Sequence, residues 1–403
     1  MMRSLISVSI LFVALLFQSA ATANISPRIY NALNELQQKI SEQPDVAAIE
    51  GIKKDLNELK ESLKSNALGL ALTLQTLSQL SDYQGDFKQS QLYLLQAINI
   101  EGLKLDTRQQ LRASLGFSYF REEEYKKAIS IMHTYIDTSE KNASAGVYAL
   151  LAASYYGLEE FQLGLPFIEK ACSLSKKPKE HWLQMAFTGH YQNKAFAKSL
   201  SYVNQLVFYY PNKKDYWNQK SGLHQLLENY PKAALSRALM HTQKLLNKES
   251  EFINFGQLMA SQGNPYAVGL ALKEAVLSKT IEPTEKVLRL EYQAWLQAKE
   301  MNRALDSLQT IYLKFNEAKD GITLMQFYLD KENWKGVNNL SESLLGAGIK
   351  EADKGRVLVM SGISLHKLNN DRKALLQLSQ AVSIEETSSQ AKGWMNYIKQ
   401  KSL

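Results

Sequence analysis

The residues whose types could support catalysis are few. Three consecutive acids, Glu122 to Glu124, stand in the stretch LGFSYFREEEYKKAISIM at 115–132, and neighbouring carboxylates of this kind are used for general acid–base chemistry. The acids lie between two predicted helices, one ending near Phe120 and the next beginning near Tyr125. Carboxylates at the start of a helix interact favourably with its dipole. We therefore interpret the three acids as a turn and a helix start, not as a catalytic pair.

Nucleophiles and metal ligands are equally isolated. Cys172 is the one cysteine of the chain, and a thiol nucleophile would need a base such as His181. Cys172 stands beside Ala171, where the repeat described below requires a small side chain, so packing is the preferred interpretation. None of the six histidines forms an HExxH motif or a pair at a spacing of three or four, as a helical zinc site would require. The sequence also has no GxSxG or GxxxxGK motif, and we predict no enzyme, no metal and no cofactor.

The elements that carry these residues follow a repeat. Each copy of the repeat begins with a leucine and a small residue. Two aromatic residues come next, and another small residue ends the pattern. Such a pattern is typical of the tetratricopeptide repeat, a helix pair of about 34 residues. Two clear copies lie 36 residues apart, at Leu115, Gly116, Tyr119, Tyr125 and Ala128 and at Leu151, Ala152, Tyr155, Phe161 and Gly164.

Degraded copies extend the repeat along most of the chain. On a common register the repeats begin near residues 71, 109, 145, 180, 214, 249, 285, 318 and 355. One helix pair cannot bury its own apolar face, so at least about three must stack for stability. We therefore predict an all-α tetratricopeptide-repeat superhelical solenoid of about nine degenerate repeats over residues 67–403.

The N-terminal residues differ in character. Residues 1–23 combine Arg3, an apolar run and the small residues Ala21 and Ala23, which is typical of a cleavable signal peptide. The run is about 13 residues long, shorter than the roughly 20 of a transmembrane helix. We expect export to the periplasm, with no transmembrane helix after cleavage.

Residues 24–66 carry two heptad-like apolar stripes, separated near Pro44. One interpretation is a helical hairpin that caps the solenoid. The other is a short coiled coil for self-association or for a partner helix.

The formal net charge of the chain is +7, and its Lys and Arg residues are scattered among 40 acids. We read this as a solvated surface without a basic block, and expect no nucleic-acid partner.

A groove offers the remaining binding surface. The first helix of each pair lines the concave side, and residues outside the packing pattern are expected to point into it. Exposed aromatic side chains in a groove can anchor a peptide, whereas the alternative for each residue is packing between repeats. The predicted partner-binding residues are Phe117, Phe120, Tyr156, Gln184, Tyr191, Asn218 and Gln225.

Four blocks resemble a particular family. The stretches YYPNKKDYW at 209–217, GNPYAVGLALKEAV at 263–276, DGITLMQFYLDKENW at 320–334 and SQAKGWMNYIKQ at 389–400 are similar to tetratricopeptide proteins encoded beside TonB energy-transduction genes in marine gammaproteobacteria. The resemblance covers about residues 60–400 and departs from the family at His224 and Gln225, where an aromatic residue after a small one is usual.

The resemblance implies a function without catalysis, because the family has no catalytic motif. It implies a periplasmic accessory of a TonB–ExbB–ExbD complex, which supports TonB-dependent iron uptake and has components of that complex as partners. The alternative is a generic periplasmic scaffold for envelope or surface-polymer assembly.

Overall fold

The computed structural model describes residues 25–139 and 143–401, so the predicted signal peptide lies outside the described residues. The described residues form helices and no strand, which confirms the all-α prediction. The helices are α1 Pro27–Ser41, α2 Val46–Ser62, α3 Ala67–Tyr83, α4 Phe87–Ile98, α5 Leu105–Arg121, α6 Tyr125–Thr138, α7 Ala145–Gly157, α8 Phe161–Ser173, α9 Glu180–Gln192, α10 Phe196–Tyr209, α11 Lys214–Leu226, α12 Tyr230–Thr242, α13 Glu249–Ser261, α14 Pro265–Leu277, α15 Glu285–Gln297, α16 Met301–Phe315, α17 Ala318–Asp330, α18 Trp334–Gly346, α19 Glu351–Lys367, α20 Asp371–Val382 and α21 Glu385–Lys401.

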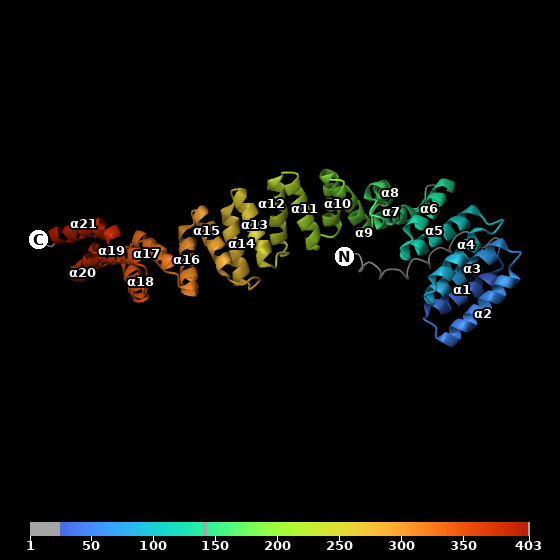
Figure 1. Ribbon diagram of the computed structural model, residues 1–403, viewed down its shortest axis with the longest axis horizontal. Coiled ribbons are helices and arrows are strands. Elements are labelled where there is room, and N and C mark those ends of the chain that lie inside the picture. The colour runs from blue at the N-terminus through green and yellow to red at the C-terminus, as the bar shows by residue number, and fades with distance from the viewer. Residues whose placement is uncertain (1–24, 140–142, 402–403) are drawn as a thin grey trace. The chain divides into compact units, whose positions relative to one another are not determined.

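The described residues divide into two compact units, one ending at Tyr209 and the other beginning at Tyr210. From α3 onward the helices follow one another in pairs within each unit, the first helix of a pair carrying an odd number (Figure 1). Within each unit each pair packs on the next, and α21 packs on both helices of the last pair. Each unit is thus a stack of tetratricopeptide-type helix pairs.

The turns within pairs explain the three acids. Glu122 is the C-terminal cap of α5, Glu123 has a φ of 59° and Glu124 precedes the first residue of α6. The Glu124 carboxylate lies 3.0 Å from the ammonium of Lys127. The structure therefore places the acids in the turn, as predicted.

Small residues allow the two helices of a pair to approach. The side chains of Ala128 and Ala152 are fully buried. A Cβ atom at Gly164 would lie 2.7 Å from the Tyr156 ring and 3.0 Å from the carbonyl oxygen of Ala152. The repeating small residues are therefore a packing requirement of the helix pair.

The first helices begin close to the predicted repeat starts. Six of them, α7, α9, α11, α13, α15 and α17, begin at the predicted residue itself. The other three, α3, α5 and α19, begin at residues 67, 105 and 351, about one turn before the predicted starts.

The two N-terminal stripes are buried within the first unit. Leu33, Leu36 and Ile40 of α1 and Ile52 and Leu56 of α2 share one core with the apolar side chains of α3. The surface that a coiled coil would use is thus covered inside the chain, which favours the capping hairpin. No helix in the described part of the chain is both long enough and apolar enough to cross a membrane.

Candidate functional site

Three of the predicted groove residues occupy equivalent places in successive helix pairs. Phe120, Tyr156 and Tyr191 stand near the ends of α5, α7 and α9, spaced 36 and 35 residues apart. Each ring contacts the aromatic residue that opens the second helix of its pair, at centroid distances within the range of favourable aromatic pairs. These distances are 5.6 Å for Phe120 and Tyr125, 5.0 Å for Tyr156 and Phe161, and 5.6 Å for Tyr191 and Phe196. We call these six residues the aromatic ladder.

Tyr156 is enclosed by residues of α8 and α9. Its hydroxyl donates to the carbonyl oxygen of Met185 in α9 at 3.1 Å, and its ring or hydroxyl fills the space beside Gly164 and Gly189. Burial, reinforced by the Glu169 carboxylate, raises the pKa of Tyr156. Tyr156 therefore joins α7 to α9, and its main role is packing between repeats.

Two aromatic side chains of this region remain open to solvent. Tyr191 at the end of α9 is 43% exposed, and Phe117, one turn before Phe120 on α5, is 40% exposed. Aromatic rings bring a large contact area at low conformational entropy cost. Phe117 and Tyr191 are therefore the residues of the predicted set that are best placed to meet a partner in the first unit.

The other predicted residues are placed differently. Gln184 is half-buried on α9, and Gln225 is exposed near the end of α11. The amide oxygen of Asn218 accepts a hydrogen bond from Nη1 of Arg237 at 2.6 Å, so this oxygen is already engaged within the chain. Asn218 and Gln225 belong to the second unit.

The lone cysteine lies in the interior. Cys172 is 7% exposed in α8, and burial together with the Glu169 carboxylate raises the pKa of its thiol to about 11. A protonated thiol is a poor nucleophile at neutral pH. The ring of His181 rests against Trp182, while the Nε2 atom of His190 lies 2.8 Å from Glu169. These contacts favour a packing role for Cys172.

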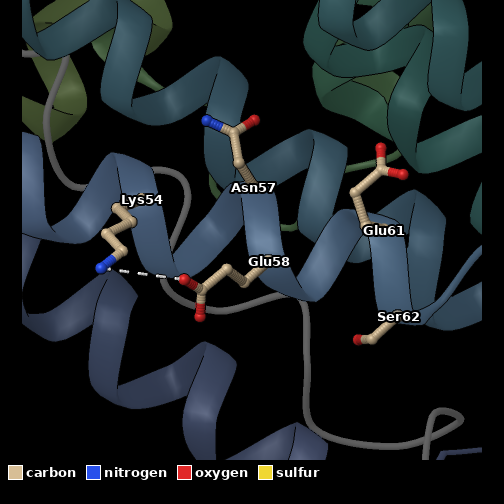
Figure 2. A pocket seen from close by; sticks show the side chains of 5 residues that line it. All are labelled: Lys54, Asn57, Glu58, Glu61 and Ser62. Carbon is tan, nitrogen blue, oxygen red and sulfur yellow. Dashed lines mark ion pairs between the residues drawn. The ribbon is translucent and has the colours of Figure 1, made fainter.

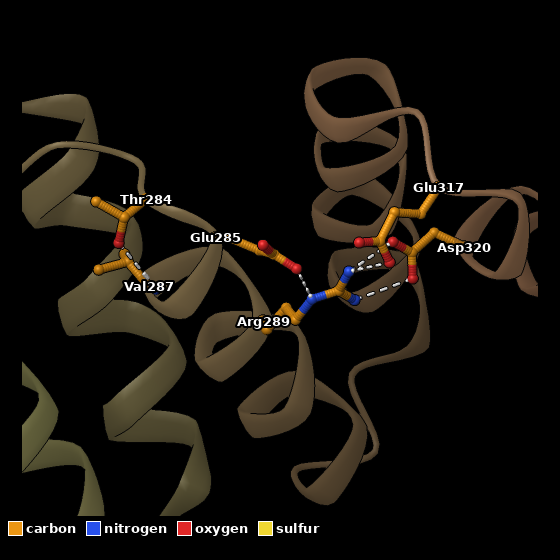
Figure 3. A network of polar contacts seen from close by, with 6 residues as sticks. All are labelled: Thr284, Glu285, Val287, Arg289, Glu317 and Asp320. Carbon is orange, nitrogen blue, oxygen red and sulfur yellow. Dashed lines mark hydrogen bonds and ion pairs between the residues drawn. The ribbon is translucent and has the colours of Figure 1, made fainter.

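An ionic cluster that was not predicted joins two helix pairs of the second unit. The guanidinium of Arg289 on α15 contacts Glu285 at 2.7 Å, Glu317 at 2.8 Å and Asp320 at 2.9 and 3.0 Å (Figure 3). The hydrogen bonds that Arg289 donates to the carboxylates of Asp320 and Glu285 raise the pKa of its guanidinium. Since Asp320 lies on α17, the cluster connects successive first helices. In the sequence, the cluster is marked only by one arginine in a first helix and two acids around the start of the following first helix.

The described ranges contain no group of three or more His, Cys, Asp or Glu side chains that could hold a metal ion. A hollow of about 700 Å³ on α2 is lined by Lys54, Asn57, Glu58, Glu61 and Ser62 (Figure 2). Its ion pair, Lys54 with Glu58 at 4.0 Å, is largely solvent-exposed, so the hollow is an open part of the surface.

Comparison with known proteins identifies similar solved structures. No family model matches the sequence, and no curated protein matches it. Similar solved structures include YrrB, described as a TPR protein with an unusual peptide-binding site, at 15% identity and a TM-score of 0.38, covering 46% of this chain and 89% of that one. PilF of Pseudomonas aeruginosa is 12% identical with a TM-score of 0.30, covering 56% and 99% of the two chains. The C-terminal part of a TPR repeat-containing protein from Cytophaga hutchinsonii is 12% identical with a TM-score of 0.34, covering 70% and 98%.

Proposed function

We propose that the protein is a non-enzymatic periplasmic scaffold that binds proteins and is accessory to a TonB–ExbB–ExbD complex supporting TonB-dependent iron uptake. The observation that carries the binding role is the exposure of Phe117 and Tyr191 on first helices whose other aromatic residues are packed. A rigid stack of helix pairs can hold such anchors in fixed positions, and a scaffold acts by raising the effective concentration of its partners.

The TonB assignment rests on the four family-like blocks. In the block at 209–217, Nε1 of Trp217 donates to the carbonyl oxygen of Pro211 at 2.7 Å, and the ammonium of Lys213 lies 5.4 Å from the centre of the Tyr210 ring. The block at 320–334 begins with Asp320, which binds Arg289. These residues set the geometry of loops and helix pairs. The resemblance therefore supports a shared scaffold, on which the exposed side chains of the first helices can differ.

Deletion of the gene should abolish growth on a scarce iron complex in a strain whose adjacent TonB system is the only one present. The physical reason is the loss of the scaffold that keeps its partners together. Overproduction of the partner should restore growth in part, because concentration then replaces tethering. Growth rate and uptake of the labelled iron complex are the measurements.

Complementation of the deletion strain supplies the matched control. The Phe117→Ala, Tyr191→Ala double variant should fail to restore uptake while it melts at the temperature of the wild type. A Leu313→Ala variant, which truncates an 83% exposed side chain of α16, should restore it. Normal growth of the deletion strain would overturn the TonB assignment and leave envelope or surface-polymer assembly as the function.

A further inference from the structure

Cations outnumber acids through the middle of the chain. Residues 210–248 hold seven Lys or Arg residues and two acids, and residues 170–209 hold six lysines and one acid. The cations are therefore unevenly distributed along the chain, although they form no long run of lysines. The two acids, Asp215 and Glu228, lie on α11 or in the turn after it, so residues 230–248 contain no carboxylate.

Three lysines of this segment extend into solvent. Lys232 lies on α12, and Lys244 and Lys248 lie in the loop that follows it. All three are exposed, and none forms an ion pair with a carboxylate of the described residues. Lys214 of the same segment is different, because its ammonium lies 2.7 Å from the carboxylate of Glu251. The exposed lysines thus present positive charge that the fold does not neutralise.

Exposed leucines lie beside these lysines. Leu235 and Leu239 follow Lys232 by three and seven residues, a spacing that puts all three on one face of α12. Leu235 is 58% exposed and Leu239 is 37% exposed. Leu270 is 38% exposed and holds the same place in α14 as Leu235 in α12, since each is the sixth residue of its helix. We define the basic apolar patch as Lys232, Leu235, Leu239, Lys244, Lys248 and Leu270.

We propose that the basic apolar patch docks on the surface of a bilayer that contains anionic phospholipids. Its charge complements the phosphate headgroups, which attract clustered lysines. Helices that lie on membranes combine lysine with leucine in this way, with the apolar side chains below the headgroups and the lysine stems extended along the interface.

The composition of the patch favours lipid over a protein partner. Lysine is depleted in protein interfaces, and leucine is under-represented among the residues that dominate their binding energy. Lysine and leucine make up the patch, and Tyr266, which is 41% exposed and lies one turn before Leu270 on α14, adds an aromatic ring of the kind found at membrane interfaces. The proposal goes beyond the scaffold function and does not depend on the identity of its protein partner.

The test is a vesicle flotation assay with the protein as cells produce it. The vesicles consist of phosphatidylcholine with or without phosphatidylglycerol. We expect binding to the anionic vesicles only. The triple variant Lys232→Glu, Lys244→Glu, Lys248→Glu should bind about a hundredfold more weakly. The matched control, Lys331→Glu, Lys335→Glu, Lys350→Glu, changes the net charge equally at three other exposed lysines of the second unit and should bind much as the wild type does.

The apolar contribution has its own variants. Leu235→Ser with Leu270→Ser should weaken binding to the anionic vesicles by about tenfold. Leu313→Ser with Leu376→Ser, at two leucines exposed elsewhere on second helices, should not. Absence of a preference for anionic vesicles, or equal losses in the two triple variants, would overturn the proposal. Binding to immobilised polyglutamate without binding to vesicles would also overturn the proposal and would indicate an acidic protein partner. The growth test of the TonB role does not depend on this result.

Discussion

Gly269→Leu is expected to lower the free energy of unfolding of the second unit by about 3 kcal/mol, through overpacking at a helix crossing. A Cβ atom at Gly269 of α14 would lie 2.6 to 2.8 Å from three carbon atoms of the Trp295 indole. Trp295 is 1% exposed, and its Nε1 donates to Glu291 at 3.2 Å. The ring therefore has no free space to move into, and α14 and α15 must separate.

Urea unfolding followed by circular dichroism measures this loss. The matched control is Gly222→Leu on α11, because no atom lies within 4 Å of a Cβ built at that helical glycine. The control should unfold at nearly the urea concentration of the wild type. Equal midpoints for Gly269→Leu and the wild type would show that α14 and α15 do not cross at Gly269.

Arg289→Met should destabilise the second unit by about 2 kcal/mol, less than the loss of a partner from a fully buried ion pair, because the side chain of Arg289 itself is 31% exposed. The substitution keeps an aliphatic stem but leaves Asp320, which is 5% exposed, without its cation. Glu285 and Glu317 would then add repulsion that the guanidinium now offsets. The loss is measured as a shift in the unfolding midpoint.

Two further variants separate the ion cluster from general effects. The Arg289→Met, Asp320→Asn double variant should recover part of the loss, since the buried charge is removed with its partner. Arg303→Met removes a more exposed arginine that lies 4.8 Å from the Trp295 ring, and it should cost less than about 1 kcal/mol. Equal losses for Arg289→Met and Arg303→Met would contradict a stabilising ion pair between Arg289 of α15 and the buried Asp320 of α17.

The helix pairs could be predicted because their packing pattern is local. Gly116 of α5 lies against Ile131 and Met132 of α6 in the same pair, so the types of residues close in sequence report the crossing. The predicted starts were late at α3, α5 and α19, which have 17 residues each. The pattern occupies the later turns of a first helix, and an additional N-terminal turn leaves it unchanged.

The surface was less predictable because it depends on side chains from neighbouring pairs. The sequence shows the regular spacing of Phe120, Tyr156 and Tyr191, but it does not show which of the three rings remains exposed. That outcome depends on Gly189, whose missing side chain leaves room for the Tyr156 hydroxyl. The engagement of Asn218 by Arg237 likewise has no local pattern. Such contacts need the structure.

Site-specific photo-crosslinking in living cells tests the scaffold proposal most directly. A photoreactive phenylalanine analogue would replace Phe117 or Tyr191, with Leu313 as the control position, and the adducts would be identified by mass spectrometry. The account predicts adducts with TonB, ExbB or ExbD at Phe117 and Tyr191 and none of these at Leu313. Adducts at Phe117 and Tyr191 that contain only other envelope proteins would contradict it.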